Sequence, residues 1–398
     1  MIPYGRQSIH EDDIAAVLRV LRSDYLTTGP EVEAFEQEFA RYVGAEHAVA
    51  VSSATAALHL LMIAMKLNPG DRVLTSPNTF LSSANAVAFC GAIPDFCDTN
   101  ASGNLDLRSL QECWQEDVRG VVVVDYAGQP ADLPGISEWA RSKGGFVIED
   151  ASHALGSRFE RDQQRYFTGG HPWADATVFS FHPVKTLTTG EGGMITTADA
   201  RLAEQLRRLR HHGVEREAER WLLADECGAG PWYYEMQELG YNYRITDLQC
   251  ALGRSQLKRI EEIVQRRLDI VRAYDEAFHD LKGFSVPVME SWLQDSRITD
   301  VRCGWHLYSP QLDFAEWGSD RNSFMNDLRQ LGVGSQVLYL PVHLQPWYRR
   351  EFGYGPGKCP HAERFFEKTI SLPLFAGMSD AQVSTVIQAV RSLAAKRR

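Results

Sequence analysis

A lysine placed shortly after an apolar strand is the residue whose type and position most clearly indicate covalent chemistry. Lys185 follows the segment 177–181 (Thr-Val-Phe-Ser-Phe), whose apolar and β-branched residues predict a strand. Burial at the end of that strand desolvates the amine and lowers its pKa, which frees a nucleophile for Schiff-base chemistry with a carbonyl compound. An isolated lysine is more often a surface residue in a turn, so this interpretation depends on what accompanies Lys185.

A second apolar run ends in a carboxylate, which is a candidate to act together with Lys185. The residues 146–148 (Phe-Val-Ile) are followed by Glu149 and Asp150. A carboxylate opposite a pyridine nitrogen keeps that nitrogen protonated, which is the state in which pyridoxal phosphate acts as an electron sink. We therefore expect Asp150 to hold the ring nitrogen of this cofactor. Taken alone, the same residue is equally well explained as a helix N-cap.

A run of small and hydroxylated residues indicates where a phosphate binds. The segment 52–56 (Ser-Ser-Ala-Thr-Ala) connects a predicted strand to a predicted helix. The free N–H groups and the positive dipole end of that helix form an anion site, although many such clusters only cap a helix. Phe80 begins the next connection of this kind and is a candidate to stack on the cofactor ring, with a core aromatic as the alternative.

The elements that position these residues alternate in type along the chain. Short apolar runs predict strands at 47–51, 72–74, 121–125 and 146–148. Helical periodicity predicts helices at 55–67, 81–89 and 133–141. This alternation predicts an α/β fold with a mostly parallel central sheet and helices on both faces. Ligands of such sheets bind beyond the carboxyl ends of the strands, where Asp125 and Asp150 lie.

The ends of the chain show other patterns. Ser8 and Glu11 are spaced as a capping box before a first helix, and a second helix is expected from Pro30 to Gly44. Thr246 is expected to cap a long helix that runs through Arg272. The later patterns predict strands near 306–312 and 333–340 and helices near 322–331 and 379–393.

The 398 residues exceed what a single core usually holds, so we expect more than one substructure. The predicted division is an N-terminal part with the large cofactor-binding α/β domain (1–245), a long connecting helix (246–282) and a small C-terminal α+β domain (283–398).

Composition excludes several classes of partner. The 41 Lys and Arg residues against 52 Asp and Glu residues leave a formal net charge of −11, which disfavours nucleic acid or an anionic membrane as a partner. The chain has no apolar stretch of about 18 residues and no signal-peptide pattern, so a cytoplasmic location is expected. Seven scattered cysteines without a C-x-x-C pair indicate neither a disulfide framework nor a zinc site. His171, His211 and His212 lack further ligands at suitable spacing, so no metal is expected.

With these residues in place, the sequence resembles the DegT-type sugar aminotransferases, which are fold type I pyridoxal-phosphate enzymes acting on nucleotide-linked keto sugars. The resemblance is carried by the segments 2–6, 26–30, 179–185, 240–247 and 338–346. It implies that Lys185 bonds covalently to the cofactor, that Asp150 holds the pyridine nitrogen and that Phe80 stacks on the ring. Ser180 and the amides of Ala54 and Thr55 are implied as phosphate ligands.

The resemblance also implies the remaining site residues. His153 is expected near the ring hydroxyl, and Tyr339 and His343 on the sugar side. Asn242 is expected to reach the phosphate of a neighbouring subunit's cofactor, which predicts a homodimer with shared active sites. The expected reaction moves an amino group from an amino acid, L-glutamate, to the C4 keto group of a UDP-linked 4-keto-6-deoxy-N-acetylhexosamine.

Two alternatives within the family and one outside it are considered. A dehydratase branch has histidine where this chain has Lys185, and other members act on different nucleotide-linked 3- or 4-keto sugars. A non-catalytic protein that only binds the cofactor is the third alternative.

One departure from the family pattern is Ala54, which replaces a glycine in the phosphate turn. If this position requires a positive φ, the alanine costs about 1 kcal/mol.

Overall fold

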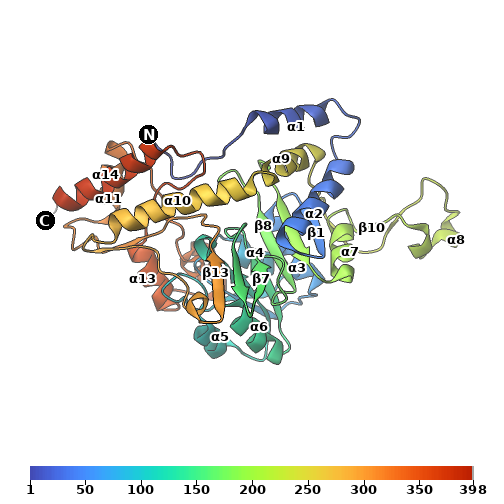
Figure 1. The fold of residues 1–398 in the computed structure, drawn as a ribbon. Coiled ribbons are helices and arrows are strands. Elements are labelled where there is room, and N and C mark those ends of the chain that lie inside the picture. Colours follow the sequence, from blue (N-terminus) through green and yellow to red (C-terminus); the bar gives the residue numbers. More distant parts are fainter. Residues whose placement is uncertain (397–398) are drawn as a thin grey trace.

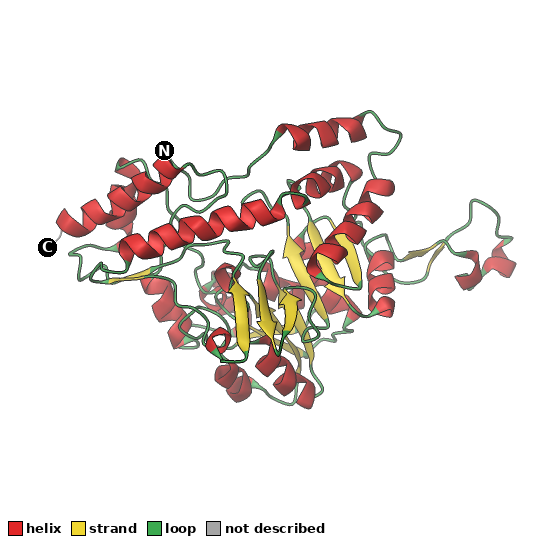
Figure 2. Ribbon diagram, in the orientation of Figure 1, coloured by secondary structure: helices red, strands yellow, loops and turns green. Residues whose placement is uncertain are grey.

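Seven strands form one central sheet in the computed structural model, which describes residues 1–396 (Figures 1 and 2). Their order across the sheet is β1 (His47–Val51), β9 (Gly193–Thr197), β8 (Ala176–Ser180), β5 (Phe146–Asp150), β4 (Val118–Val124), β2 (Arg72–Thr75) and β3 (Ile93–Phe96). The neighbours from β8 to β3 pair in parallel, whereas β9 runs antiparallel to β1 and to β8. The predicted, mostly parallel α/β sheet is therefore confirmed.

Helices cover both faces of this sheet, as the alternation of side chains along β4 shows. Val122 packs in an apolar cluster with α3 (Ala54–Ala64) and α7 (Ala200–Leu209). Val121 and Val123 point the other way, into a cluster with α5 (Leu107–Cys113) and α6 (Leu133–Ser142). Because successive side chains of a strand point to opposite faces, the central strands are buried twice, which explains their unbroken runs of valine. The remaining crossover helix is α4 (Ser82–Phe89).

The first two helices test the predicted caps. The second helix, α2 (Pro30–Val43), begins at Pro30 and ends before Gly44, whose φ of 77° is left-handed, as predicted. The predicted capping box of Ser8 and Glu11 is wrong. The helix α1 (Glu11–Leu21) begins at Glu11 with His10 as N-cap, and Asp13 completes the box by accepting the backbone N–H of His10 at 2.9 Å.

The prediction of one continuous helix after Thr246 is wrong, because the structure has two helices there. Thr246 caps α9 (Asp247–Leu257), and a new helix, α10 (Ile260–Phe278), follows after a break at residues 258–259. The two helices serve different neighbours, since α9 packs against α1 and α2 whereas α10 packs against α14 (Asp380–Lys396). The two helices therefore join different parts of the structure.

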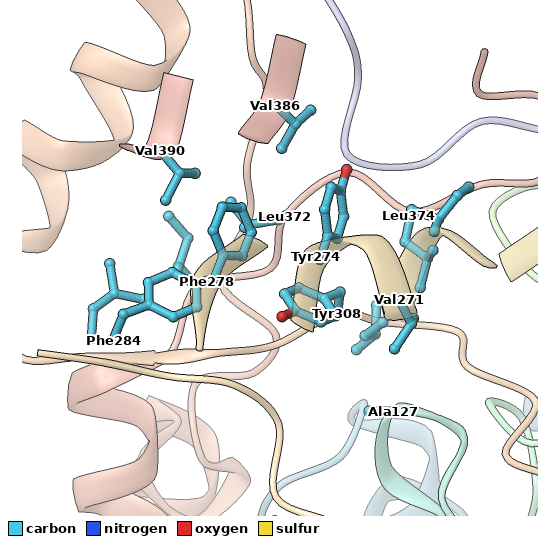
Figure 3. Packing of buried hydrophobic residues seen from close by; sticks show 14 of the residues in the cluster. Ala127, Val271, Tyr274, Phe278, Phe284, Tyr308, Leu372, Leu374, Val386 and Val390 are labelled. Atoms are coloured by element: carbon cyan, nitrogen blue, oxygen red, sulfur yellow. The ribbon is translucent and has the colours of Figure 1, made fainter. Parts of the chain in front are cut away.

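Apolar residues of the C-terminal part pack around α10 in a cluster that also includes Ala127 and Phe159 of the N-terminal part. Tyr274 and Phe278 of that helix pack with Val386 and Val390 of α14 and with Leu372 (Figure 3). The helix α11 (Arg321–Gln330) matches its prediction. The predicted domain boundaries remain a prediction, and the last two residues, 397 and 398, lie outside the described residues.

The two predicted C-terminal strands are wrong over most of their length. Of residues 306–312, only β14 (Gln311–Leu312) is a strand, paired with β12 (Phe284–Ser285), and residues 333–340 make only isolated bridges. The backbone N–H of His306 donates instead to the carbonyl of Ala127 at 2.8 Å, so this segment is held by a loop and not by a sheet. Strand propensity describes a half-buried extended chain and does not supply the pairing partner.

The other elements lie outside the central sheet. A three-stranded sheet contains β6 (Arg158–Arg161), β7 (Gln164–Phe167) and β13 (Ile298–Arg302). An arm that extends from the body carries β10 (Val214–Glu215), α8 (Ala224–Cys227) and β11 (Glu235–Met236) (Figure 1). The helices α12 (Pro346–Phe352) and α13 (Pro360–Lys368) precede α14. Among the described helices, none combines the length and the hydropathy that a membrane span requires.

Candidate active site

A cavity of about 420 Å³ lies at the carboxyl ends of β5 and β8, beside the start of α3. Most of the predicted site residues line it: Ala54, Thr55, Phe80, Asp150, His153, Ser180, Lys185 and Tyr339. They come from segments far apart in the sequence, which the parallel strands and the crossover helices bring to one edge of the sheet.

Asp150 is held in one orientation by hydroxyl and amide donors. It is the last residue of β5 and only 4% exposed. Its Oδ2 accepts a hydrogen bond from the Ser83 hydroxyl at 2.7 Å, and its Oδ1 accepts one from the backbone N–H of Ser152 at 3.1 Å. The Thr79 hydroxyl lies 2.8 Å from that of Ser83 and extends the chain. Both Asp150 donors are neutral, so no cation within this set cancels the carboxylate's charge.

Lys185 lies in the loop after β8 and has the electrostatics of a nucleophile. Its backbone N–H donates to the carbonyl of His182 at 2.9 Å, which closes a turn. Burial lowers the pKa of its amine to about 8, Asp150 opposes this shift and Arg267 adds to it. About a tenth of an amine with this pKa is neutral at pH 7, far more than of an ordinary lysine.

Arg267 of α10 supports this region from behind the cavity. Its side chain is buried, and its Nη1 donates to the carbonyls of Trp305 and His306, each at 3.3 Å, and of Leu374 at 3.1 Å. Burial lowers the pKa of this guanidinium to about 10. The arginine thus fixes the loop that carries His306 into the cavity.

Two imidazoles and a phenol form one wall of the cavity. His153 Nε2 lies 3.1 Å from the Tyr339 hydroxyl, and the rings of His153 and His306 are 4.5 Å apart. Burial, followed by the charge of Lys185, holds the pKa of both histidines well below the usual range, so both rings are neutral. The Nδ1 atoms of His153 and His306 are buried and have no hydrogen-bond partner among the described residues.

The start of α3 provides an anion site at the other end of the cavity. Ser53 caps this helix by accepting the N–H of Ala56 at 3.1 Å. The N–H groups of Ala54 and Thr55 belong to the first turn, where the helix itself offers no acceptor. Ser180 ends β8 in the same lining and adds a hydroxyl.

Ala54 is the first residue of α3 and takes a helical conformation, so the strain cost considered for a positive φ does not arise. The glycine that this turn needs is Gly193 on the neighbouring strand β9. A Cβ at Gly193 would lie 2.7 Å from the nitrogen of Ala54 and 2.7 Å from the carbonyl carbon of Ser53. Gly193 therefore lets β9 approach the backbone of the phosphate turn closely.

These groups fit pyridoxal phosphate in kind and in place. Phe80 is 56% exposed and lines the cavity with its ring 6.2 Å from that of Tyr339, so an apolar face is available for a flat heterocycle. Asp150 offers the carboxylate for a ring nitrogen, Lys185 the amine, and the first turn of α3 the phosphate donors.

Two predicted residues are not brought to the cavity. The expected sugar-side position of His343 is wrong, because its side chain is fully buried and its Nε2 pairs with Glu363 Oε1 at 2.9 Å. Its ring lies 6.0 Å from that of Phe96, in a satellite core. Asn242 is exposed and forms an isolated bridge with His211 outside the cavity lining.

Sequence reasoning missed Ser83, His306 and Arg267. Ser83 lies in the first turn of the predicted helix 81–89, where serine is common, so its type and position did not single it out. His306 stood inside a segment taken for a strand, and a buried arginine on a helix has no sequence signal of its own.

A lysine and a carboxylate at the edge of a mostly parallel sheet, with an anion site between strand and helix, define a fold type I pyridoxal-phosphate enzyme. The family model described as "DegT/DnrJ/EryC1/StrS aminotransferase family" matches residues 7–391. The chain belongs to this family of sugar aminotransferases and is a pyridoxal-phosphate-dependent aminotransferase.

Individual relatives are similar to this protein in sequence or structure over nearly the whole chain. It is 40% identical over 394 residues to the spore coat polysaccharide biosynthesis protein SpsC of Bacillus subtilis, covering 98% of this chain and 97% of the relative. The solved structure of Helicobacter pylori PseC, an aminotransferase involved in pseudoaminic acid biosynthesis, superimposes with a TM-score of 0.88 at 28% identity, covering 99% of each chain. A putative sugar aminotransferase, Spr1654 from Streptococcus pneumoniae, gives a TM-score of 0.88 at 29% identity, covering 100% of each chain.

Proposed function

We propose that this protein transfers an amino group from L-glutamate to the C4 keto group of a UDP-linked 4-keto-6-deoxy-N-acetylhexosamine, in the pseudaminic acid pathway or a related surface-sugar pathway. The observation that carries the proposal is the meeting of Lys185 and Asp150 in one cavity with the exposed ring of Phe80. The names of the H. pylori and B. subtilis relatives, which refer to pseudoaminic acid and to a coat polysaccharide, support the choice of substrate.

Pyridoxal phosphate, when bound, supplies the carbonyl that exchanges amines and the ring that stores an electron pair. The chain's own residues do the rest. Asp150 keeps a proton on the ring nitrogen, and Ser83 and Ser152 keep the carboxylate aimed at it. The Lys185 Nζ would remove the proton from the carbon that bears the donor's amino group and deliver it to the cofactor's carbonyl carbon, on the far side of that nitrogen. The N–H groups of Ala54 and Thr55 hold the phosphate and so orient the reacting atoms.

The wall formed by His153, Tyr339 and Phe80 has groups that suit a sugar. Tyr339 and His153 offer a hydroxyl and a neutral imidazole 3.1 Å apart, and Phe80 offers an apolar face beside them. Neutral hydrogen-bonding groups next to an aromatic ring match a sugar ring with its N-acetyl group. Burial raises the pKa of Tyr339, so its hydroxyl stays protonated and can donate to a sugar oxygen.

A substrate panel tests this proposal. The purified enzyme is incubated with L-glutamate and a set of nucleotide-linked 3- and 4-keto sugars, and products are identified by mass spectrometry. We expect the UDP-linked 4-keto-6-deoxy-N-acetylhexosamine to gain an amino group, with release of 2-oxoglutarate. Faster turnover of another nucleotide or of a 3-keto sugar would favour the second candidate within the family. Bound cofactor without any turnover would favour a non-catalytic role.

We propose further that the active site is shared in a homodimer, with Asn242 reaching the phosphate of the neighbouring subunit's cofactor. Its exposure, and its position outside the cavity of its own chain, support this. Asn242→Asp places a negative charge beside a phosphate, and Lys185→Ala removes the nucleophile, so each homodimer should be nearly inactive.

Mixed dimers of the two variants give the test. A mixed dimer has one site with both residues intact and one with neither. Random mixing makes about half of the dimers mixed, so co-refolding should restore roughly a quarter of wild-type activity if the sites act independently. No recovery, with mixed dimers verified by mass spectrometry, would place Asn242 in its own chain's site.

A further inference from the structure

A pocket of about 290 Å³ beside α13, here called the α13 pocket, lies outside the active-site cavity. It is bounded by the chain that follows β3 and β4, at residues 100–102 and 126–129, and by residues 285–288 and α13 of the C-terminal part. None of its described lining residues is an aspartate or a glutamate. In a chain with a formal net charge of −11, a concave surface without carboxylates is a candidate site for an anion.

The positive charge of the α13 pocket comes from one face of the helix. His361, Arg364 and Lys368 are spaced by three and four residues, so they project from the same side of α13, and all three line the pocket. Glu363 of the same helix is paired with His343 at 2.9 Å. Arg364 and Lys368, by contrast, form no ion pair with a described residue. Two cationic groups are therefore available to a ligand.

Two carboxylates hydrogen-bond to residues of this lining. Asp98 accepts the backbone N–H of His361 at 2.9 Å and so caps α13. Glu290 accepts the Asn100 amide at 2.8 Å and the Ser102 hydroxyl at 2.9 Å. Burial raises the pKa of Glu290, which favours its neutral form. Both carboxylates are thus bonded to donors of the protein, and neither pairs with the cations of α13.

The donors of the α13 pocket suit a phosphate group in kind and number. A guanidinium binds two oxygens of a phosphate in parallel, and an ammonium adds a point charge. Ser285, Ser309 and Gln311 add two hydroxyls and an amide to the lining. Because a water molecule takes about 30 Å³ of liquid volume, a pocket of about 290 Å³ holds a phosphate together with a small organic group.

The α13 pocket and the active-site cavity lie on the two sides of Tyr126. This residue lines the α13 pocket, and its hydroxyl donates to the carbonyl of Leu338, which lines the active-site cavity, at 2.6 Å. The carbonyl of the next residue, Ala127, accepts the backbone N–H of His306 at 2.8 Å. The two cavities have no described lining residue in common. A ligand of the α13 pocket would therefore contact the back of the active-site wall without entering the cofactor site.

We propose that the α13 pocket binds the phosphate group of a small molecule, at a site separate from that of the cofactor, with Arg364 and Lys368 as the main ligands. The proposal does not rest on the proposed function, because it uses no residue of the active-site cavity.

Calorimetric titration of the whole holoenzyme with pyrophosphate, in a phosphate-free buffer of low ionic strength, tests the site. We expect one pyrophosphate per chain, with an affinity that falls at least about tenfold in Arg364→Gln and in Lys368→Gln, because each change removes a charged ligand. Arg329→Gln, which alters an exposed arginine on α11 outside the pocket, is the matched control and should bind as wild type. No binding, or equal affinities in all variants, would overturn the proposal. Succinate binding as tight as that of pyrophosphate would overturn the assignment to phosphate.

Turnover of the same variants distinguishes a separate site from a part of the substrate site, since the proposed nucleotide-sugar substrate also carries a diphosphate. Without pyrophosphate, the KM for the sugar substrate should be unchanged in Arg364→Gln and Lys368→Gln. A rise in KM by the factor by which pyrophosphate affinity falls would show that this pocket holds the substrate's diphosphate, and the separate site would be wrong. The titration needs no turnover, so failure of the proposed substrate would leave its result interpretable.

Discussion

Two pockets of this molecule have similar volumes but contain charged groups that are paired differently. The active-site cavity of about 420 Å³ is smaller than a pocket of about 590 Å³ between α2 and α7, which contains Glu36, Arg207 and Arg210. In the larger pocket the charged groups pair with one another: Glu36 forms ion pairs with both arginines and also accepts the backbone N–H of Ala50 at 2.9 Å.

In the active-site cavity the donors to Asp150 are neutral, and burial makes the Lys185 amine easier to deprotonate. Reactivity therefore depends on how the charged groups are buried and partnered and not on the volume around them. Charged side chains stabilise the fold in the pocket between α2 and α7 and take part in the reaction in the active-site cavity. Substitutions in the two pockets should consequently have opposite effects on activity and stability.

The largest expected effect is the loss of activity in Lys185→Ala. Removing the nucleophile and proton carrier should lower turnover by at least about 10³-fold, while the temperature of unfolding of the cofactor-free protein changes little. Borohydride reduction of the wild-type holoenzyme, followed by peptide mapping, should find the cofactor on Lys185. Finding it on another lysine would contradict the assignment of this residue.

Asp150→Asn should lower kcat by about 10²- to 10³-fold with a smaller change in cofactor affinity, because the carboxylate acts on the protonation of the ring and the phosphate contacts remain. Steady-state kinetics and cofactor titration by absorbance measure the two quantities separately. A loss of affinity as large as the loss of kcat would mean that Asp150 mainly binds the cofactor.

Glu36→Gln tests the pocket between α2 and α7, where we expect a loss of stability without a loss of activity. Activity should stay near the wild-type value, whereas the free energy of unfolding should fall by about 2 kcal/mol, because Arg210, which is only 15% exposed, loses its carboxylate partner and keeps only the carbonyl of Ala50. Urea unfolding of the cofactor-free protein measures this loss. Arg207→Gln is the milder control, since this arginine is more exposed. If Glu36→Gln instead lost activity without losing stability, the larger pocket and not the cavity around Lys185 would contain the catalytic residues.

Ser83→Ala should reduce kcat by about tenfold with little effect on KM, because it removes the hydroxyl that orients Asp150 without touching the substrate. Ser137, a buried serine on α6, provides a matched Ser→Ala control outside the cavity. Restoration of activity in Ser83→Thr, which keeps the hydroxyl, would support an orienting role. Equal effects of the two Ser→Ala changes would indicate a general packing defect.

The smallest expected effect is a shift in pH dependence. Burial lowers the pKa of Lys185 from 10.5 to about 8, so the unfolded chain binds more protons than the folded one between these pH values. The cofactor-free protein should therefore gain stability as pH rises from about 8 to 10.5, relative to Lys185→Met, which lacks the titrating group. Acylation of Lys185 should reach half its maximal rate near pH 8. A midpoint near 10.5 would show that the amine is not desolvated.

Much of the fold was accessible from local patterns. The strand at 47–51, the start of α2 at Pro30 and the end before Gly44 were predicted correctly, because periodicity and caps act over a few neighbouring residues. Lys185 and Asp150 could be proposed because each follows an apolar run that ends at the same edge of a parallel sheet.

Other features depended on distant contacts. The helix after Thr246 breaks where its two halves meet different partners, and the predicted strand at 333–340 lacks a paired neighbour. His343 shares a motif segment with Tyr339 but turns into a satellite core and pairs with Glu363. Neither outcome has a signal within the segment itself.

The sequence by itself therefore determined the class of fold, the family resemblance and the two residues with the clearest chemistry, because these follow from short-range periodicity and from motifs. Only the tertiary structure decided that Ser83 orients Asp150, that Arg267 holds the loop of His306, and that Glu36 pairs with two arginines. Hydrogen bonds and ion pairs between distant segments depend on how the chain closes around its cores, and no local pattern records which donor finally meets which acceptor.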